Sequence, residues 1–361
     1  VFTAAIGPVI QYYKTGASVI DTIYTNAESF FKEATYPTDG LKSTISSVFR
    51  RISGDPTAPS IYRLETAFGG GNTHSLIACV HIANCGNKHA GITDELIDPS
   101  ILPEPGSVAV VGIAGDEIPV NEVKGDNLVP YTLWGELAFQ LGGQDLYNSV
   151  KKDAESFAAP GRNFLEQVLG DQKILIMLDE LAQYAARLEV AHADGASQLA
   201  AFIMALNGYA KNHSGIAIVV TLAGAADAFS KQTERLTSLL NNVSTEGLRA
   251  DDAIAIAEKA AKGVTSVTMR DATAVTPVQA HEIASVLAKR LFKTIDASAA
   301  SVAADEYVAM YQRNSAILPE EAVSLRFKER LISNYPFHPT LVDFLNNKLA
   351  QAENFQGTRG V

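Results

Sequence analysis

The sequence predicts an α/β fold in which a mostly parallel sheet is flanked by helices. Three short apolar runs carry this prediction, at residues 107–114, 173–178 and 215–222, and helical patterns separate them. Apolar runs of this length without alternation suit strands that are buried on both faces. Strands that alternate with helices favour right-handed crossovers and parallel pairing. The 361 residues, 47% of them hydrophobic, suffice for a sizeable core and about two domains.

The elements follow in order along three predicted regions. We expect an N-terminal helical segment at 1–56, a sheet-bearing core at 57–275 and an all-helical lid subdomain at 276–361. In the core, a strand at 61–66 precedes a helix at 73–83, and a helix at 131–141 is stopped by Gly142 and Gly143. Further core elements are a helix at 197–211, an alanine-rich helix at 246–263 and a last strand at 264–269. The lid helices lie near 277–291, 302–311, 319–332 and 339–350.

Charge and cysteine content argue against a protein drawn to nucleic acid or membrane by its overall charge, a disulfide-stabilised protein and a cysteine metal site. The net charge of −11 provides no global attraction to nucleic acid or to an anionic membrane, so any DNA contact is local or made by a partner. The basic clusters at 50–51, 151–152 and 328–330 are interpreted as solvated helix faces. The two cysteines, Cys79 and Cys85, have neither a disulfide framework nor a metal-ligand spacing. His74 and His81 on the same helix are interpreted as packing or solvent-facing residues.

The chain carries no sign of membrane insertion or targeting. No apolar run reaches the ~20 residues of a spanning helix, and the N-terminus lacks a signal-like segment. We therefore expect a cytoplasmic protein. Because the chain begins with Val1, we also expect it to be part of something longer.

A glycine-rich segment, Thr-Ala-Phe-Gly-Gly-Gly-Asn-Thr-His at 66–74, joins the strand at 61–66 to the following helix. In a phosphate-binding loop, GxxxxGK[ST], glycine N–H groups surround the β-phosphate, lysine reaches the β- and γ-oxygens, and the Ser/Thr hydroxyl holds Mg²⁺. Here Gly71 and Thr73 keep their places, Thr66 replaces the first glycine and Asn72 replaces the lysine. A helix N-terminus also favours an anion. Taken alone, a glycine triplet before a helix is equally a flexible turn.

Two acids follow the apolar run at 173–178. Asp179 and Glu180 stand at the carboxyl end of a buried strand, where ligands bind in α/β sheets. The chemical interpretation places Asp179, with Thr73, in a Mg²⁺ shell and makes Glu180 the base that deprotonates the attacking water. The structural alternative is that Asp179 caps the next helix and Glu180 lies in its first turn. Thr221 ends the next strand beside the expected γ-phosphate, although threonine is also a common strand residue.

Several segments together resemble a family of large prokaryotic AAA+-like ATPases. They are Phe30-Phe31 with 35–42, the glycine loop at 66–74, 178–180, and the C-terminal segments 335–339 and 355–361. Members of that family carry a GGGKTH loop, long went under a domain-of-unknown-function label, and occur beside DNA-modification, restriction and phage-defence genes. The resemblance covers most of this chain, which corresponds to the N-terminal ATPase module of the longer family members.

The resemblance implies a P-loop NTPase of the ASCE/AAA+ type that binds ATP and Mg²⁺. It further implies a homo-oligomer or a subunit of a defence complex, with DNA contacted indirectly. Arg359 resembles a lid arginine that senses the γ-phosphate, and Arg249, Arg270 and Arg290 are candidate arginine fingers. The residues expected to contact nucleotide are Phe68, Gly69, Gly70, Gly71, Asn72, Thr73 and His74.

Asn72 departs from the family lysine, because asparagine is shorter and neutral. Losing one charge-assisted contact costs on the order of 1.5–3 kcal/mol, enough to weaken ATP binding by one to two orders of magnitude. Whether Asn72 is an inactivating substitution, a natural degenerate site or a site rescued by an arginine stays open. The leading hypothesis is an ATPase module of a DNA-targeting defence system. A non-hydrolysing scaffold is the second, and a direct DNA-binding module the third.

Overall fold

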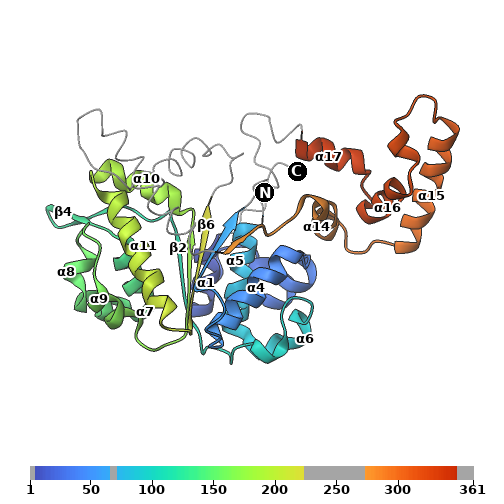
Figure 1. Cartoon of the computed structure of the whole chain (residues 1–361). Helices are drawn as coiled ribbons and strands as arrows, with labels where there is room; N and C mark the ends of the chain where they lie inside the picture. The colour runs from blue at the N-terminus through green and yellow to red at the C-terminus, as the bar shows by residue number, and fades with distance from the viewer. Residues whose placement is uncertain (1–4, 66–70, 223–272, 348–361) are drawn as a thin grey trace.

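The computed structural model describes residues 5–65, 71–222 and 273–347, and a five-stranded sheet lies at its centre (Figure 1). The strands run in the order β2-β5-β6-β1-β7, and every neighbouring pair is parallel. This confirms the predicted α/β fold with a mostly parallel sheet. The bounds are β1 (Ile61–Glu65), β2 (Ala109–Ala114), β5 (Ile174–Asp179), β6 (Ile216–Leu222) and β7 (Thr273–Val275).

Strand β5 is buried on both faces. Its residues Ile174, Ile176 and Leu178 belong to one hydrophobic cluster, and Leu175 and Met177 belong to a second. Because side chains alternate along a strand, an uninterrupted apolar run is what a strand covered on both sides requires. The apolar run in the sequence therefore indicates directly that helices cover both faces of the sheet at this strand.

Five helices cover one face of the sheet. The fifth is the helix predicted at 197–211, and its Leu199, Phe202, Ile203 and Leu206 are all buried. Trp134 packs against Phe202 with ring centroids 5.3 Å apart. The helices are α7 (Leu133–Ser149), α8 (Lys151–Ala154), α9 (Arg162–Leu169), α10 (Leu181–Ala191) and α11 (Gly195–Lys211).

Three longer helices cover the opposite face: α1 (Ile6–Thr15), α4 (Asp39–Ile52) and α5 (Asn72–Cys85). Helix α1 approaches β2 closely because Gly112 has no side chain; a Cβ there would lie 2.3 Å from the Cδ1 atom of Ile10. Short segments complete this layer: α2 (Thr22–Thr25), α3 (Ala27–Ser29), the π-helical η1 (Phe30–Ala34), η2 (Gly86–His89), α6 (Ala90–Thr93) and η3 (Pro99–Ile101).

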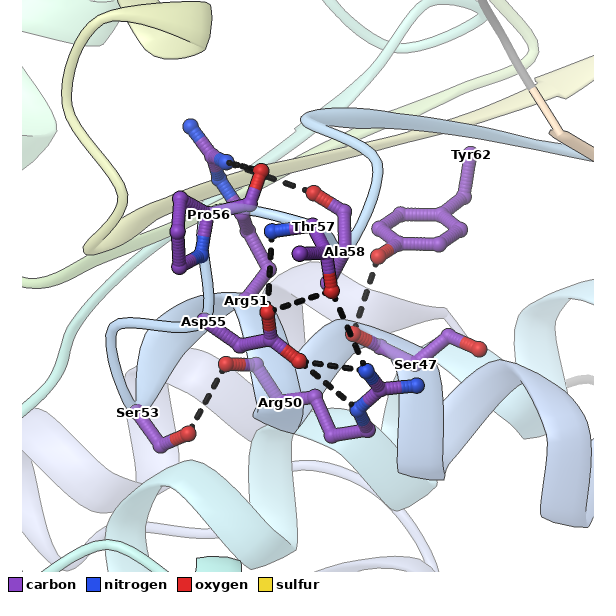
Figure 2. Close-up of polar contacts among 9 residues, drawn as sticks. All are labelled: Ser47, Arg50, Arg51, Ser53, Asp55, Pro56, Thr57, Ala58 and Tyr62. Carbon is purple, nitrogen blue, oxygen red and sulfur yellow. Dashed lines mark hydrogen bonds and ion pairs between the residues drawn. The ribbon is translucent and has the colours of Figure 1, made fainter.

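The end of α4 is anchored by one of two adjacent arginines (Figure 2). Arg51 is 2% exposed and donates to five backbone carbonyl oxygens, those of Pro56, Ala58, Ala210, Lys211 and Ile216. Arg50 instead forms an exposed ion pair with Asp55. The interpretation of both arginines as a solvated helix face is therefore wrong for Arg51, because backbone carbonyls of a loop, of the end of α11 and of β6 surround its guanidinium and replace water.

Three features of the core differ from the sequence prediction or extend it. Helix α7 does not end at the glycine pair; the backbone breaks there, with φ +64° at Gly143, and the helix resumes because Tyr147 packs into the core. A hairpin of β3 (Asn121–Lys124) and β4 (Asn127–Pro130) precedes α7, and β7 forms the edge beside β1. The helix predicted at 246–263 and the strand predicted at 264–269 lie outside the described residues.

After β7 the described chain is helical. Two small hydrophobic clusters hold this region together, one around Tyr311, Phe327 and Leu331 and the other around Ile283 and Val342. No helix within residues 5–65, 71–222 and 273–347 has the length and apolar character needed to cross a membrane. The helices are η4 (Ala280–Glu282), α14 (Ile283–Leu291), α15 (Ala297–Arg313), η5 (Glu320–Val323), α16 (Leu325–Asn334) and α17 (Pro339–Asn347).

Candidate functional site

Three polar residues predicted to act together meet at the carboxyl edge of the sheet. Asp179 is the last residue of β5, Thr221 is the penultimate residue of β6, and Thr73 lies in the first turn of α5. Strand β6 lies between β1 and β5, so the end of β5 and the start of the helix that follows β1 are brought close without being neighbours in the sheet. Parallel strands end at the same edge, which is where ligands bind in such sheets.

Hydrogen bonds join these three residues. The Thr221 hydroxyl donates to Oδ1 of Asp179 and accepts the backbone N–H of Glu180 at 3.0 Å. The Thr73 hydroxyl donates to Oδ2 of Asp179 at 3.4 Å. Asp179 and Thr221 are 7% and 2% exposed, so the carboxylate is held in a fixed orientation away from bulk water. Its two oxygens thus face one strand and the start of one helix.

The environment of Asp179 disfavours its charged form. Burial raises the pKa of this carboxyl above its usual value, and the charge of Asp116 adds to the effect, while the bonds from Thr221 and Thr73 oppose it. A carboxylate kept charged at such a position gains from a nearby cation. The donor set is made of oxygen atoms only, which Mg²⁺ prefers, and Mg²⁺ takes its remaining ligands from water and phosphate. Thr73 and Asp179 therefore fit a magnesium ion that is completed by a phosphate ligand.

The described residues form no metal site from protein side chains alone. Across the described parts of the chain, no group of three or more His, Cys, Asp or Glu side chains is placed to hold a metal ion. His81, interpreted from the sequence as a packing or solvent-facing residue, is fully buried, and its ring nitrogens lie 2.6 Å from the Tyr13 hydroxyl and 3.1 Å from the Tyr24 carbonyl oxygen. The histidines of α5 are thus engaged by the protein.

Glu180 has an unusual backbone. With φ +49° and ψ +36°, it is the one non-glycine residue with positive φ in the described chain. Its position is crowded, since a Cβ on Gly115 would lie 2.3 Å from the Glu180 carbonyl oxygen. Gln183 donates to its carboxylate at 3.2 Å. Left-handed conformations of residues with side chains cost energy and cluster at functional sites, so this backbone favours a role beyond capping α10.

The glycine loop is described from Gly71 onward. Gly71 has φ +115°, and the helix begins at the next residue. The Ser75 hydroxyl donates to the Gly71 carbonyl oxygen at 2.7 Å, which fixes the first turn. Asn72, Thr73 and His74 therefore form the N-terminal turn of a 14-residue helix, whose N–H groups and dipole favour an anion. Phe68, Gly69 and Gly70 lie outside the described residues.

His74 faces the protein rather than the loop. Its ring stacks on Phe30, with centroids 4.3 Å apart. Its Nε2 atom lies 3.0 Å from the Thr35 hydroxyl and its Nδ1 atom 3.1 Å from the Arg290 guanidinium. Burial, with the nearby charge of Arg290, lowers the pKa of His74 to about 3, so the ring is neutral. A contact between His74 and nucleotide stays a prediction.

Some neighbours of the site were not anticipated. Asp116 follows β2 just as Asp179 ends β5, so the same pattern of an apolar run followed by acids could have indicated it. Thr35 and Gln183 had no such signal. Of the arginines considered, Arg290 lies against His74, whereas Arg249, Arg270 and Arg359 lie outside the described residues.

Comparison with known proteins identifies the family. Residues 3–245 match the model of the DUF499 N-terminal domain, and residues 278–361 match that of the DUF499 second domain. No curated protein and no solved structure matches the chain. The two matches follow one another in the order that their names give and cover most of the sequence. The chain belongs to the DUF499 family.

Proposed function

We propose that this chain is a Mg²⁺-ATP-binding ATPase module of the AAA+ type, in a bacterial DNA-modification or phage-defence system. The observation that carries the proposal is the meeting of Thr73, Asp179 and Thr221 at one sheet edge, where the sequence alone had placed a metal ligand pair and a γ-phosphate neighbour. The position of β6 between β1 and β5 supports the ASCE type of P-loop NTPase. The defence setting and the oligomeric assembly rest on the family resemblance.

The geometry supports specific roles for the residues. The N–H groups at the start of α5 would bind phosphate oxygens, and Thr73 and Asp179 would hold Mg²⁺, which neutralises phosphate charge when bound. Glu180 would take a proton from the water that attacks the γ-phosphorus, and the bond from that phosphorus to the β,γ-bridging oxygen breaks as ADP leaves. Thr221 orients Asp179 and supports the backbone of Glu180.

Asn72 sets the expected level of activity. It stands in the first turn of the helix, where the family lysine would reach the β- and γ-oxygens. Its neutral amide cannot offset the charge that develops in the transition state, and electrostatic stabilisation of that charge usually contributes most to the rate. We therefore expect weak ATP binding and slow hydrolysis. Asn72→Lys is expected to tighten binding by about 10- to 100-fold, the range that one charge-assisted contact provides.

Titration calorimetry with Mg²⁺ and ATP, combined with a phosphate-release assay, tests the proposal. The variants are the chain itself, Asn72→Lys, and Asn72→Lys combined with Thr73→Ala. Binding that tightens with the lysine and weakens again without the Thr73 hydroxyl supports the site. If neither the chain nor Asn72→Lys binds ATP, the proposed function is wrong.

A non-hydrolysing scaffold is the second candidate, and Asn72 is the observation that favours it. The strained backbone of Glu180 argues for a retained base, because a site without chemistry has no need to hold a glutamate in that conformation. Glu180→Gln in the Asn72→Lys background separates the two candidates. A loss of phosphate release with unchanged ATP binding supports the ATPase, and no phosphate release from Asn72→Lys itself supports the scaffold.

A further inference from the structure

His74 lies next to Thr73 but directs its side chain to two other segments of the chain. Phe30 begins the π-helical segment η1 and Thr35 directly follows it, and Arg290 lies in the last turn of α14. Arg290 and His74 are 216 positions apart in the sequence. The first residues belong to the DUF499 N-terminal domain and Arg290 to the second domain, so His74 stands at the junction between them.

The hydrogen bonds define the tautomer of His74. The Thr35 hydroxyl donates its proton to the carbonyl oxygen of Phe30 at 2.8 Å, so it can only accept from His74. Nε2 of His74 therefore carries the proton. Nδ1 is then the acceptor for Arg290, which is consistent because a guanidinium has donors only. Thr35 and Arg290 thus both require the neutral tautomer that is protonated on Nε2, and together they fix the orientation of the ring.

The second domain also contacts the other end of the same helical turn. A Cβ on Gly71 would lie 3.0 Å from Val278 and 3.2 Å from Pro277, so the chain that enters the second domain passes directly over this glycine. The Thr38 hydroxyl donates to the Pro277 carbonyl oxygen at 2.6 Å. Residues 72 and 73 therefore lie between two contacts to the second domain, one at Gly71 and one at His74.

We propose that His74 is a positioning residue that couples the second domain to the first turn of α5: through Arg290, docking of α14 holds this turn, and with it Thr73, in the geometry that binds Mg²⁺-nucleotide. The proposal rests on the proposed function. The side chain of His74 contacts Phe30, Thr35 and Arg290, and in this proposal it acts through the turn that carries Thr73. Coupling is reciprocal, so nucleotide at Thr73 also strengthens docking of α14.

The test uses two variants. His74→Phe keeps a ring stacked on Phe30 but removes both ring nitrogens, and Arg290→Met removes the guanidinium that contacts His74 from the second domain. His81→Phe is the control on the same helix, because it also removes two ring nitrogens, which bond to the Tyr13 hydroxyl and the Tyr24 carbonyl oxygen. It leaves in place both the His74 contact of Arg290 and the bond from Arg290 to the Tyr24 hydroxyl. Hydrogen exchange without nucleotide reports on the first turn of α5 and on α14. Calorimetry with Mg²⁺ and ATP in the Asn72→Lys background reports on binding.

We expect His74→Phe and Arg290→Met each to speed exchange in both segments and to weaken ATP binding by about tenfold, within the usual range of coupling between sites. The double variant should be no weaker than either single one, and His81→Phe should leave exchange in α14 unchanged. Unchanged exchange in α14 in His74→Phe, or additive losses in the double variant, overturns the coupling. A different outcome would overturn the proposed function and not the contact between the domains. In that outcome Asn72→Lys fails to bind ATP, while His74→Phe and Arg290→Met still speed exchange in both the first turn of α5 and α14.

Discussion

Replacing Arg51 with methionine is expected to destabilise the first domain severely. The change keeps most of the aliphatic stem and removes a guanidinium that donates to five carbonyl oxygens, of which Figure 2 shows those of Pro56 and Ala58. Hydrogen bonds from a charged donor contribute about 1.5–3 kcal/mol each, but the distances of 3.2–3.4 Å for four of them are long and the buried charge costs part of the gain. We therefore expect a net loss of about 3–5 kcal/mol, typical of removing one partner of a buried charged contact.

Thermal unfolding followed by circular dichroism checks this value, and the adjacent arginine provides the control. A loss of this size lowers the Tm of a domain of 150–250 residues by roughly 10 °C. Arg50→Met removes an exposed ion pair, with a side chain that is 48% exposed, and should change Tm only slightly. Equal shifts for the two variants, or no shift for Arg51→Met, would refute the view that the carbonyl contacts of Arg51 stabilise the sheet.

Three further predictions concern the candidate site. Asp179→Asn should raise Tm at pH values above the raised pKa of Asp179 and should abolish any dependence of ATP binding on Mg²⁺. Because that pKa is raised in the folded chain, stability falls as pH rises from the usual carboxyl range through it. The gain in Tm must therefore vanish in acid, and a gain that persists there contradicts the assignment. Glu180→Gly should raise Tm, because glycine removes left-handed strain of about 1 kcal/mol, and should stop phosphate release; a lower Tm argues against strain. Gly71→Ala should lower Tm and speed hydrogen exchange around Val278, because φ of Gly71 is +115° and the new methyl group would lie 3.0 Å from the Val278 side chain. Unchanged exchange there would show that residues 277–278 shift to accommodate the methyl group without loss of structure.

Much of the core could be predicted because its signals are local. The apolar runs that became β2, β5 and β6 need only their own residues to be recognised, and parallel pairing then brings the ends of β5 and β6 together. The position of Asp179 and Thr221 at one edge of the sheet follows from these runs alone. Local pattern and topology were sufficient there.

The parts that were missed depend on contacts between distant residues. The hairpin of β3 and β4 offers few apolar residues, and its exposed Val123 and Leu128 give no burial pattern. The contact between His74 and Arg290 joins residues without any shared periodicity. Arg51 was misinterpreted because nothing in the sequence distinguishes it from the adjacent, solvated Arg50. Only the carbonyl groups that surround Arg51 in the folded chain separate the two.

The hydroxyl of Thr221 has a single proton, and that proton is committed to Asp179. Any ligand that takes over Oδ1 of Asp179 sets the proton free to turn toward a new acceptor, while the oxygen still receives the N–H of Glu180. Rotation about one bond, Cβ–Oγ1 of Thr221, thus links the occupancy of Asp179 Oδ1 to the direction in which the Thr221 hydroxyl donates. Valine at position 221 would preserve the shape of the strand but would have no hydroxyl to make this connection.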